Sequence, residues 1–274
     1  MLAIISKDSI GADFLKNICI SSGKSLLKQS FSDKLRRQED GWGIGYYIEK
    51  KPFIFKSEKA IFNEKELFEK KIKAAENSKI FIAHIRDASN PKKLPHKKLI
   101  SRENSQPFFL DNIVFAHNGT LFICDEIYSN LGKYKKYVKG VNDSEILFWE
   151  FIKILEAYGD ISVALKMLKD EIKTVWFSIE KDLKNKGINT PYRGLNIFVS
   201  DGNELFAMED YELKPQKYSI MTHRWKWGKY ALKRENGKII IASEPCDNSQ
   251  WEKAQMPIIT MGKNGKIDLA KEQR

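Results

Sequence analysis

The sequence has few cysteines. It contains three, Cys19, Cys124 and Cys246, which is an odd number without CxxC spacing. A disulfide framework needs paired cysteines and a zinc knuckle needs closely spaced ones, so the pattern argues against both. Because an isolated cysteine is more often a small core residue than a reactive group, we expect three reduced thiols.

Long apolar runs are also missing. No run approaches the roughly 18 residues needed to span a membrane, and the N-terminus has no positive flank, apolar centre and cleavage site of a secretory leader. These features predict a cytoplasmic protein without a membrane partner. With 274 residues, 42% hydrophobic content, no internal repeat and no linker-like segment, residues 1–274 are predicted to form one domain.

The formal charge of +11 raises the question of a nucleic-acid partner. Lysine is spread along the chain and alternates with glutamate, as in Asn63-Glu64-Lys65-Glu66. This pattern favours a solvated Lys/Glu surface over a surface that follows phosphates. A nucleic-acid-binding protein stays open as a disfavoured alternative, and a steep loss of affinity with added salt would be its signature.

Apolar periodicity predicts strands and helices in alternating groups. Asp143 or Asn142 is a candidate N-cap for the third helix, and Asp201-Gly202 and Asn236-Gly237 are typical of hairpin turns. Helices between two groups of strands indicate a mixed α/β sandwich with mostly antiparallel sheets. The predicted strands are 2–5, 40–48, 53–55, 80–85, 112–117, 195–200, 204–208, 218–222, 225–232, 238–243 and 257–261, and the predicted helices are 11–27, 63–77, 143–158 and 161–173.

Three patterns in the sequence each match only part of a known binding motif. Ser22-Gly23-Lys24-Ser25 ends like a phosphate-binding loop but has no upstream glycine and follows a helical segment. The alternating glycines of 41–45 lack the later glycine and helix of a dinucleotide fingerprint. No pair among the four histidines has ligand spacing, so His84 and His117 are first interpreted as core residues.

Polar residues at the ends of the predicted strands and helices suggest a binding site. Asn118-Gly119 alone is typical of a hairpin turn, but an asparagine amide and a glycine N–H can also form an oxyanion hole. Arg86 follows a buried strand, where a guanidinium needs a carboxylate partner. Asp143 is either a helix cap or a partner for an ammonium group. The set fits an α-amino acid with a distal amide, and glutamine has this chemistry.

Six motifs, in order along the chain, together make the sequence resemble the stand-alone class II glutamine amidotransferases. The resemblance extends from the first strand to about Met261. Together, the motifs are far more specific than any one alone. They are Glu39-Asp40-Gly41-Trp42-Gly43-Ile44-Gly45-Tyr46-Tyr47, Ala83-His84-Ile85-Arg86-Asp87-Ala88-Ser89, Glu103-Asn104-Ser105-Gln106-Pro107-Phe108, Phe115-Ala116-His117-Asn118-Gly119-Thr120-Leu121, Asn142-Asp143-Ser144-Glu145 and Ala242-Ser243-Glu244-Pro245.

The resemblance implies a fold and a set of roles. The fold is a four-layer α/β/β/α sandwich of the N-terminal-nucleophile hydrolase type. Arg86 would bind the α-carboxylate of glutamine and Asp143 its α-amine, while Asn118 and Gly119 would form the oxyanion hole. Trp42 and Gly43 would line the nucleophile's side of the pocket, and His84 joins the substrate-binding set. The reaction needs neither metal nor cofactor, and an ammonia acceptor would be a separate chain unless the protein is a free-standing amidase.

The nucleophile of the family is absent from this sequence. In the family it is an N-terminal cysteine whose own α-amine acts as base. Here Leu2 follows Met1, and Met1-Leu2-Ala3-Ile4 resembles the continuation of a Met-Cys-Arg start. The favoured hypothesis is a cysteine encoded upstream of Met1, and a catalytically silent glutamine-binding module is the alternative. Cys19 lies inside a predicted helix and has no free α-amine, so this chain as written is predicted to lack glutaminase activity.

Overall fold

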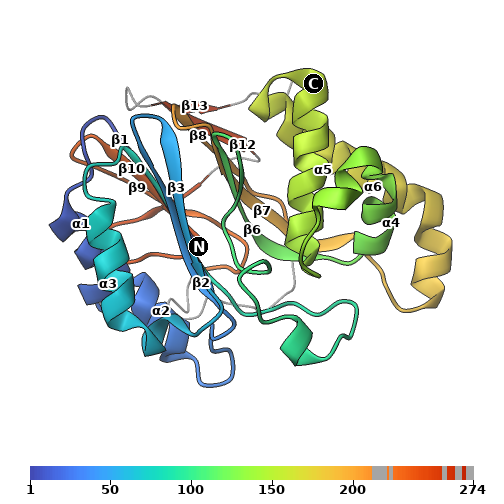
Figure 1. Cartoon of the computed structure of the whole chain (residues 1–274), viewed down its shortest axis with the longest axis horizontal. Coiled ribbons are helices and arrows are strands. Elements are labelled where there is room, and N and C mark those ends of the chain that lie inside the picture. The colour runs from blue at the N-terminus through green and yellow to red at the C-terminus, as the bar shows by residue number, and fades with distance from the viewer. Residues whose placement is uncertain (212–220, 222–224, 255–257, 263–266, 270–274) are drawn as a thin grey trace.

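Two antiparallel β-sheets form the centre of this computed structural model, and helices cover the outer face of each (Figure 1). The structure describes residues 1–211, 221, 225–254, 258–262 and 267–269. The strands of the first sheet are β1 (Leu2–Ser6), β2 (Trp42–Ile48), β3 (Lys51–Ser57), β4 (Ile80–Ile85), β9 (Ala231–Glu235), β10 (Lys238–Ala242) and β11 (Glu252–Lys253). Those of the second are β5 (Phe108–Leu110), β6 (Ile113–Leu121), β7 (Tyr192–Ser200), β8 (Glu204–Met208), β12 (Ile258–Gly262) and β13 (Ile267–Leu269).

The strand order places β1 and β6 inside their sheets. The seven-stranded sheet has the order β11-β9-β10-β1-β4-β2-β3, and the six-stranded sheet has the order β13-β12-β8-β7-β6-β5. β1 pairs with β10 on one side and β4 on the other, while β6 pairs with β7 from Val114 to Leu121 and with β5 only from Ile113 to Phe115. Inner strands of this kind give a rigid frame for a site.

Helices form the two outer layers, as Figure 1 shows on either side of the sheets. The first group is α1 (Ala12–Lys16), a π-helical turn (Asn17–Ser21), α2 (Leu26–Ser32) and α3 (Lys65–Ala74). The second is α4 (Cys124–Asn130), α5 (Asp143–Tyr158) and α6 (Ile161–Asn185). Short 3₁₀ turns occur at Ile61–Asn63, His96–Lys98 and Gly132–Tyr137.

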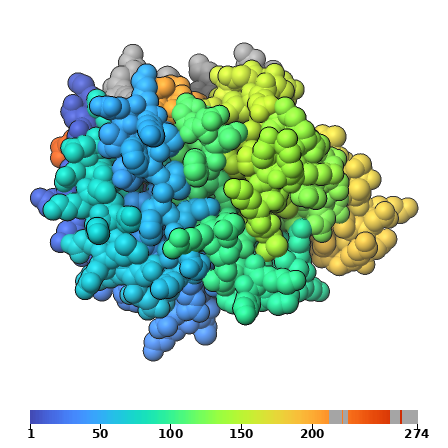
Figure 2. All heavy atoms as spheres, in the orientation of Figure 1, coloured from blue at the N-terminus to red at the C-terminus, as the bar shows by residue number. Residues whose placement is uncertain are grey.

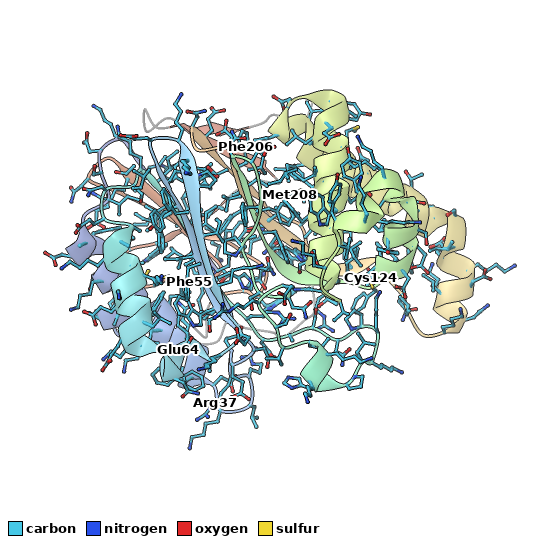
Figure 3. The ribbon with its side chains drawn as sticks, in the orientation of Figure 1. Arg37, Phe55, Glu64, Cys124, Phe206 and Met208 are labelled. Carbon is cyan, nitrogen blue, oxygen red and sulfur yellow. The ribbon has the colours of Figure 1, made fainter. Side chains whose placement is uncertain are left out.

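Three apolar clusters hold the layers together. On β1, Leu2 and Ile4 pack toward the first helix group, while Ala3 and Ile5 pack between the sheets, as the two-residue period of a strand requires. The third cluster joins the second sheet to α4–α6 and includes Phe206 and Met208 of β8, labelled in Figure 3. Side chains fill the space between the ribbons on the face shown in Figure 2. The predicted α/β/β/α sandwich is confirmed.

Local capping explains the boundaries of the two long helices. The Asn142 side chain accepts a hydrogen bond from Ser144 N and is the N-cap of α5, which ends at Gly159 with φ 72°. The Asp160 side chain accepts from Val163 N and begins α6. Since nothing interrupts the following apolar pattern, α6 continues to Asn185, beyond the predicted end at Lys173.

Several predicted elements differ from the structure. The helix predicted over 11–27 is broken, because Ser25 caps a separate helix α2 by accepting from Lys28 N. The strand predicted over 225–232 begins only at Ala231. The strand predicted over 218–222 lies almost entirely outside the described residues. Both predicted hairpin turns are confirmed, with positive φ at Gly202, Asn236 and Gly237. In the described part of the chain, no helix has the length and apolarity to cross a membrane.

Candidate active site

A cavity of about 300 Å³ lies where strand ends from both sheets meet. A smaller cavity of about 50 Å³ shares His84, Asn118 and Gly119 with it. Pockets with convergent polar groups of this kind are the usual places for ligand binding. The larger cavity is lined by Met1, Gln29, Arg36, Gln38, His84, Ile85, Asp87, Ala88, Ser89, Asn118, Gly119, Thr120, Arg193, Trp227, Gly228, Ser243 and Glu244.

The first residue of the chain forms part of the wall of the larger cavity. The α-amine of Met1 donates to Ser243 Oγ at 3.1 Å, and the backbone carbonyl of Met1 accepts from Ser243 N at 2.9 Å. Burial lowers the pKa of this amine, and the charges of Cys246 and Glu244 oppose the shift. Since β1 pairs with β10 and both Met1 and Ser243 line the larger cavity, the N-terminal end of β1 points to that cavity.

Arg86 lies directly after β4 and lines the smaller cavity. Its side chain is buried, and Nη1 donates to the carbonyls of Asp40 at 3.1 Å and Leu99 at 2.8 Å. Burial lowers the pKa of Arg86, while the carboxylates of Asp40, Asp143 and Asp87 act in the opposite direction. The guanidinium is thus held in place at the edge of the site by backbone groups and nearby acids.

His84 is the penultimate residue of β4 and lines both cavities. Burial lowers its pKa well below the ordinary value, and the positive charges of the N-terminus and Arg86 act in the same direction. Nδ1 is buried and has no hydrogen-bond partner within the described part of the chain. His84 is therefore a neutral ring near neutral pH, with one ring nitrogen that has no hydrogen-bond partner among the described residues.

Asn118 and Gly119 lie within β6 and line both cavities. The hairpin interpretation of this pair is therefore wrong, because the strand continues through both residues to Leu121 and pairs with β7. A Cβ at position 119 would meet Gly194 O of β7 at 1.9 Å. Glycine is required here by this close backbone approach and not by a turn.

His117 and Gln106 fix the backbone just before Asn118. The ring nitrogens of His117 contact Ser144 Oγ and Gly194 O, each at 2.9 Å, which links β6 to α5 and β7. The Gln106 side chain accepts from His117 N at 2.6 Å and donates to His117 O at 3.0 Å. These buried hydrogen bonds position the Asn118-Gly119 segment.

Asp143 lies at the start of α5, behind the cavity wall. Its carboxylate accepts from Leu121 N at 2.7 Å and from Ser89 Oγ at 3.2 Å, and Ser89 lines both cavities. Asp143 also interacts electrostatically with Arg86. The structure therefore brings Asp143, Arg86 and Asn118 into one region, although Asp143 itself is not among the residues that line either cavity.

Trp42 and Gly43 do not line either cavity, contrary to the sequence-based expectation. Trp42 points to the helix-covered face of its sheet, where its ring meets Phe55 at a tilt and Phe68 edge-on, and it donates to Glu64 Oε2 at 2.9 Å. Figure 3 shows Glu64 beside α2 and α3. Gly43 instead faces Gln106, whose carbonyl oxygen a Cβ would meet at 2.3 Å. Gly43 thus allows the Gln106 segment to approach β2.

None of the three cysteines lines either cavity. All three are buried free thiols, as predicted. Burial raises the pKa of Cys124 and Cys246 to about 12 and that of Cys19 well above its ordinary value, so all three stay protonated near neutral pH. The described residues also hold no cluster of three or more His, Cys, Asp or Glu side chains suited to a metal ion.

Several cavity residues were not assigned a role from the sequence. Gln106 and Glu244 lie in recognised motifs but carry no individual signal. Arg193, Gln38 and Trp227 could not be found from the sequence, because only the tertiary pairing brings them to the cavity. A polar residue beside a glycine in a strand, such as Arg193 before Gly194, was the one available hint.

Comparison with known proteins finds solved structures of similar fold. A structure of a glutamine aminotransferase class-II domain protein from Silicibacter pomeroyi is similar with a TM-score of 0.58 and 16% identity, covering 98% of each chain. Glutamine phosphoribosylpyrophosphate amidotransferase from B. subtilis, solved with ADP and GMP, gives 0.59 and 17% over 99% of this chain and 49% of that one. No curated protein matches. Residues 11–274 match the family model described as glutamine amidotransferases class-II, and the chain therefore belongs to that family.

Proposed function

We propose that this protein hydrolyses the side-chain amide of glutamine and supplies ammonia, with a cysteine encoded upstream of Met1 as nucleophile. The observation that carries the proposal is a pair of cavities that share Asn118 and Gly119 of β6: Met1, before β1, lines the larger cavity and Arg86, after β4, lines the smaller one. A guanidinium and an amide-binding pair at adjoining cavities suit an α-amino acid with a distal amide.

The register of β1 supports an upstream nucleophile. Leu2 pairs with Ala83 and Ala242, so the same register would set a first added residue opposite Ile85 and Glu244. Both of these residues line the cavity. A second added residue, the cysteine of a Cys-Arg extension, would lie opposite Arg86. The thiol would then be next to the proposed substrate carboxylate site and the Asn118-Gly119 pair.

The proposed chemistry proceeds through a thioester. The α-amine of the new N-terminus takes the proton of the thiol. The thiolate then attacks the amide carbon, and Asn118 with Gly119 stabilises the charge that develops on the oxygen. The C–N bond breaks as the α-amine of the new N-terminus passes a proton to the leaving nitrogen, and ammonia departs. Water then attacks the thioester and releases glutamate. Burial lowers the pKa of the Met1 amine, and the same burial would favour the basic form of an α-amine placed in this part of the cavity.

A glutaminase assay on three purified chains tests the proposal. One chain is as written, one carries Cys-Arg before Met1, and the third carries Ser-Arg there as the matched control. Mass spectrometry verifies removal of the initiator methionine. We expect glutamate and ammonia only from the Cys-Arg form. A folded, correctly processed Cys-Arg form that releases neither product would contradict the proposal.

A silent glutamine-binding module is the second candidate. It is favoured by the absence of any cysteine among the residues that line the two cavities. In that case calorimetry would detect glutamine binding to the Cys-Arg form without turnover. Binding that is lost in Arg86→Gln would then assign the cavity to sensing or scaffolding.

A further inference from the structure

Two lysine-rich segments of the chain lie side by side. Residues 92–104 belong to the connection between β4 and β5, and residues 125–141 run from α4 to just before α5 (Figure 1). Lys92 Nζ forms an ion pair with Asp125, and the side chain of Asn104 accepts a backbone hydrogen bond at 2.8 Å from the second segment. These contacts join the two segments into one surface, called the basic surface below.

The basic surface carries more than half of the net charge of the chain. Up to residue 139 its two segments contain nine basic and three acidic side chains, which is a net charge of +6 against +11 for all 274 residues. Spacing along the chain predicts lysines that alternate with glutamates, but the fold brings together two segments in which glutamate is scarce. A local excess of one sign attracts a polyanion from a distance.

Most of the basic side chains of this surface are not neutralised by a carboxylate. Three of the nine, Lys92, Arg102 and Lys133, each form an ion pair. Among the residues that the structure describes, no ion pair joins the other six to an acid. These six are Lys93, Lys97, Lys98, Lys135, Lys136 and Lys139. Lysines of this kind hold only counterions, which a chain of phosphates displaces on binding.

Two tyrosine rings lie among these lysines and reach the solvent. Tyr128 is 36% exposed and Tyr137 is 42% exposed. Lys135 Nζ lies 5.6 Å from the ring centroid of Tyr128, and Lys136 Nζ lies 4.9 Å from that of Tyr137. Tyr137 also stacks on the buried Trp149, with centroids 5.0 Å apart, which fixes the orientation of its ring. An aromatic ring beside a cation suits a flat base that is followed by a phosphate.

The combination of rings and lysines distinguishes three kinds of polyanion. A nucleic-acid duplex presents phosphates but keeps its bases stacked inside. An acidic peptide presents carboxylates and has no regular series of flat rings. A single strand of nucleic acid offers phosphates and accessible bases together, and proteins bind it with basic grooves that contain aromatic side chains. The basic surface therefore fits the single strand best.

We propose that the basic surface binds single-stranded nucleic acid, with its lysines on the phosphates and the rings of Tyr128 and Tyr137 on the bases. Every base has a flat face, so this binding depends little on base sequence. None of the residues of the basic surface lines either cavity. The inference is therefore independent of the proposed amide hydrolysis.

Fluorescence anisotropy of a labelled oligothymidine of about twelve nucleotides measures this binding to the whole chain. If about four phosphates are neutralised, the affinity should fall about fiftyfold between 50 and 200 mM KCl. One variant replaces four exposed lysines of the basic surface: Lys97→Gln, Lys98→Gln, Lys136→Gln and Lys139→Gln. It should bind at least about tenfold more weakly, because most of the phosphate contacts are lost.

The matched control makes the same change of net charge elsewhere. It replaces four exposed lysines in and just after α3: Lys65→Gln, Lys70→Gln, Lys73→Gln and Lys79→Gln. This control should keep nearly the full affinity, since it leaves both segments of the basic surface unchanged. A comparison of the two variants thus separates a local surface from the overall charge of the chain.

Tyr137→Ala tests the stacking of a base on the ring. We expect about tenfold weaker binding in this variant and nearly full affinity in Tyr137→Phe, which keeps the ring. Tyr158→Ala is the control, because Tyr158 is 56% exposed at the end of α5 and lies outside the basic surface. If the lost contact with Trp149 unfolds Tyr137→Ala, the same reduction is expected from Tyr128→Ala.

Several results would overturn the inference. These are no binding at 50 mM KCl, or an equal loss of affinity in the two four-lysine variants. A polyglutamate peptide that competes as well as the unlabelled oligothymidine would assign the surface to an acidic protein instead. Binding of a duplex that is as tight, and that Tyr137→Ala leaves unchanged, would assign it to phosphates alone. None of these results bears on the glutaminase assay, which decides the proposed function separately.

Discussion

At the scale of single residues, the site depends on backbone positions that a side chain fixes or that a missing side chain permits. Gly119 allows β7 to approach β6. The side-chain amide of Gln106 hydrogen-bonds to both the backbone N–H and the backbone carbonyl of His117. Gly119 follows Asn118 in β6 and Gln106 holds the residue before it, so the two residues fix the backbone on either side of Asn118. Substitution of Gly119 or Gln106 should therefore displace the backbone at Asn118 more than it displaces the rest of the core.

Gly119→Ala tests the close approach of β6 and β7. The added Cβ would meet Gly194 O at 1.9 Å, so the strands must separate. We expect a loss of about 1–3 kcal/mol in the free energy of unfolding and loss of glutamine binding. Thermal unfolding and calorimetry measure the two effects. Gly11→Ala is the control, because a Cβ there meets nothing within 4 Å and should leave both quantities nearly unchanged.

Gln106→Leu tests whether a side-chain amide positions the oxyanion-hole segment. Leucine is close in size but leaves His117 N and O buried without their partners, at a cost of about 1–3 kcal/mol each. We expect lower stability in urea unfolding and weaker binding of glutamine. Asn112→Ala removes an exposed amide contact to Asp201 O and serves as control. Unchanged stability in Gln106→Leu would refute the positioning role.

At the scale of elements, a buried ionic cluster joins three helices of the outer layer. Lys153 Nζ of α5 contacts Glu150 Oε1 at 2.7 Å, Glu171 Oε1 of α6 at 2.9 Å and Asn130 O of α4 at 3.2 Å. Glu150 Oε2 is buried and has no hydrogen-bond partner in the described residues. Burial, followed by the nearby Glu171, raises the pKa of Glu150 to about 7.

This raised pKa makes helix packing depend on pH. Between the ordinary glutamate value and about 7, the folded state keeps a proton that the unfolded state has released. The contribution of Glu150 to stability is therefore present at low pH and is lost as the pH rises through this window. In Glu150→Gln we expect this decline, of roughly 1–3 kcal/mol, to disappear. Urea unfolding at pH 5 and pH 7.5 measures it.

Glu180→Gln provides the comparison for the pH experiment. Glu180 is partly exposed on α6, where it pairs with Lys184 one helical turn away. The Glu180→Gln substitution removes a carboxylate that pairs with a lysine, but it leaves the contacts among Glu150, Lys153 and Glu171 intact. The decline between the two pH values should persist in this variant. A decline that also persists in Glu150→Gln would show that another group is responsible.

The sequence predicted elements well where burial and capping agree. Helix α5 is predicted from residue 143 to 158 and has these bounds, because Asn142 caps it and Gly159 ends it. The break between α1 and α2 was missed, since the apolar spacing runs across Ser25 as if one helix continued. In the site, Arg86 and Asn118 were predicted to lie near each other, and both line the smaller cavity. Trp42 was not, because a strand alternates its faces and a motif alone does not tell which face points to the cavity.

At the scale of the whole molecule, the apolar layer between the sheets unites the two halves. Phe198 of β7 stacks on Tyr230, with ring centroids 4.9 Å apart, and both side chains are fully buried. Met1 belongs to the same layer. The cavity therefore lies at the edge of the core that fixes the distance between the sheets.

Phe198→Ala should consequently destabilise both halves together. We expect a loss of about 3–5 kcal/mol in the free energy of unfolding. Far-ultraviolet and near-ultraviolet circular dichroism should report one coincident transition at a lower temperature. Phe177→Ala is the control, since Phe177 on α6 is 70% exposed and should change stability little. Two separated transitions would contradict the view of a shared core.

Arg193 lines the larger cavity and forms a β-bulge, because Thr120 pairs with Gly194 and Leu121 pairs with Tyr192. This bulge gives the fold a simple way to change the charge of the cavity. Because Arg193 is the extra residue between two pairs of β6 and β7, deleting it would leave a regular ladder instead of a gap. One deleted codon would remove a positive charge from the cavity while the strands on either side stay joined. A chain that lacks this one residue would therefore differ in the charge of its cavity wall without any change at Arg86, Asn118 or Gly119.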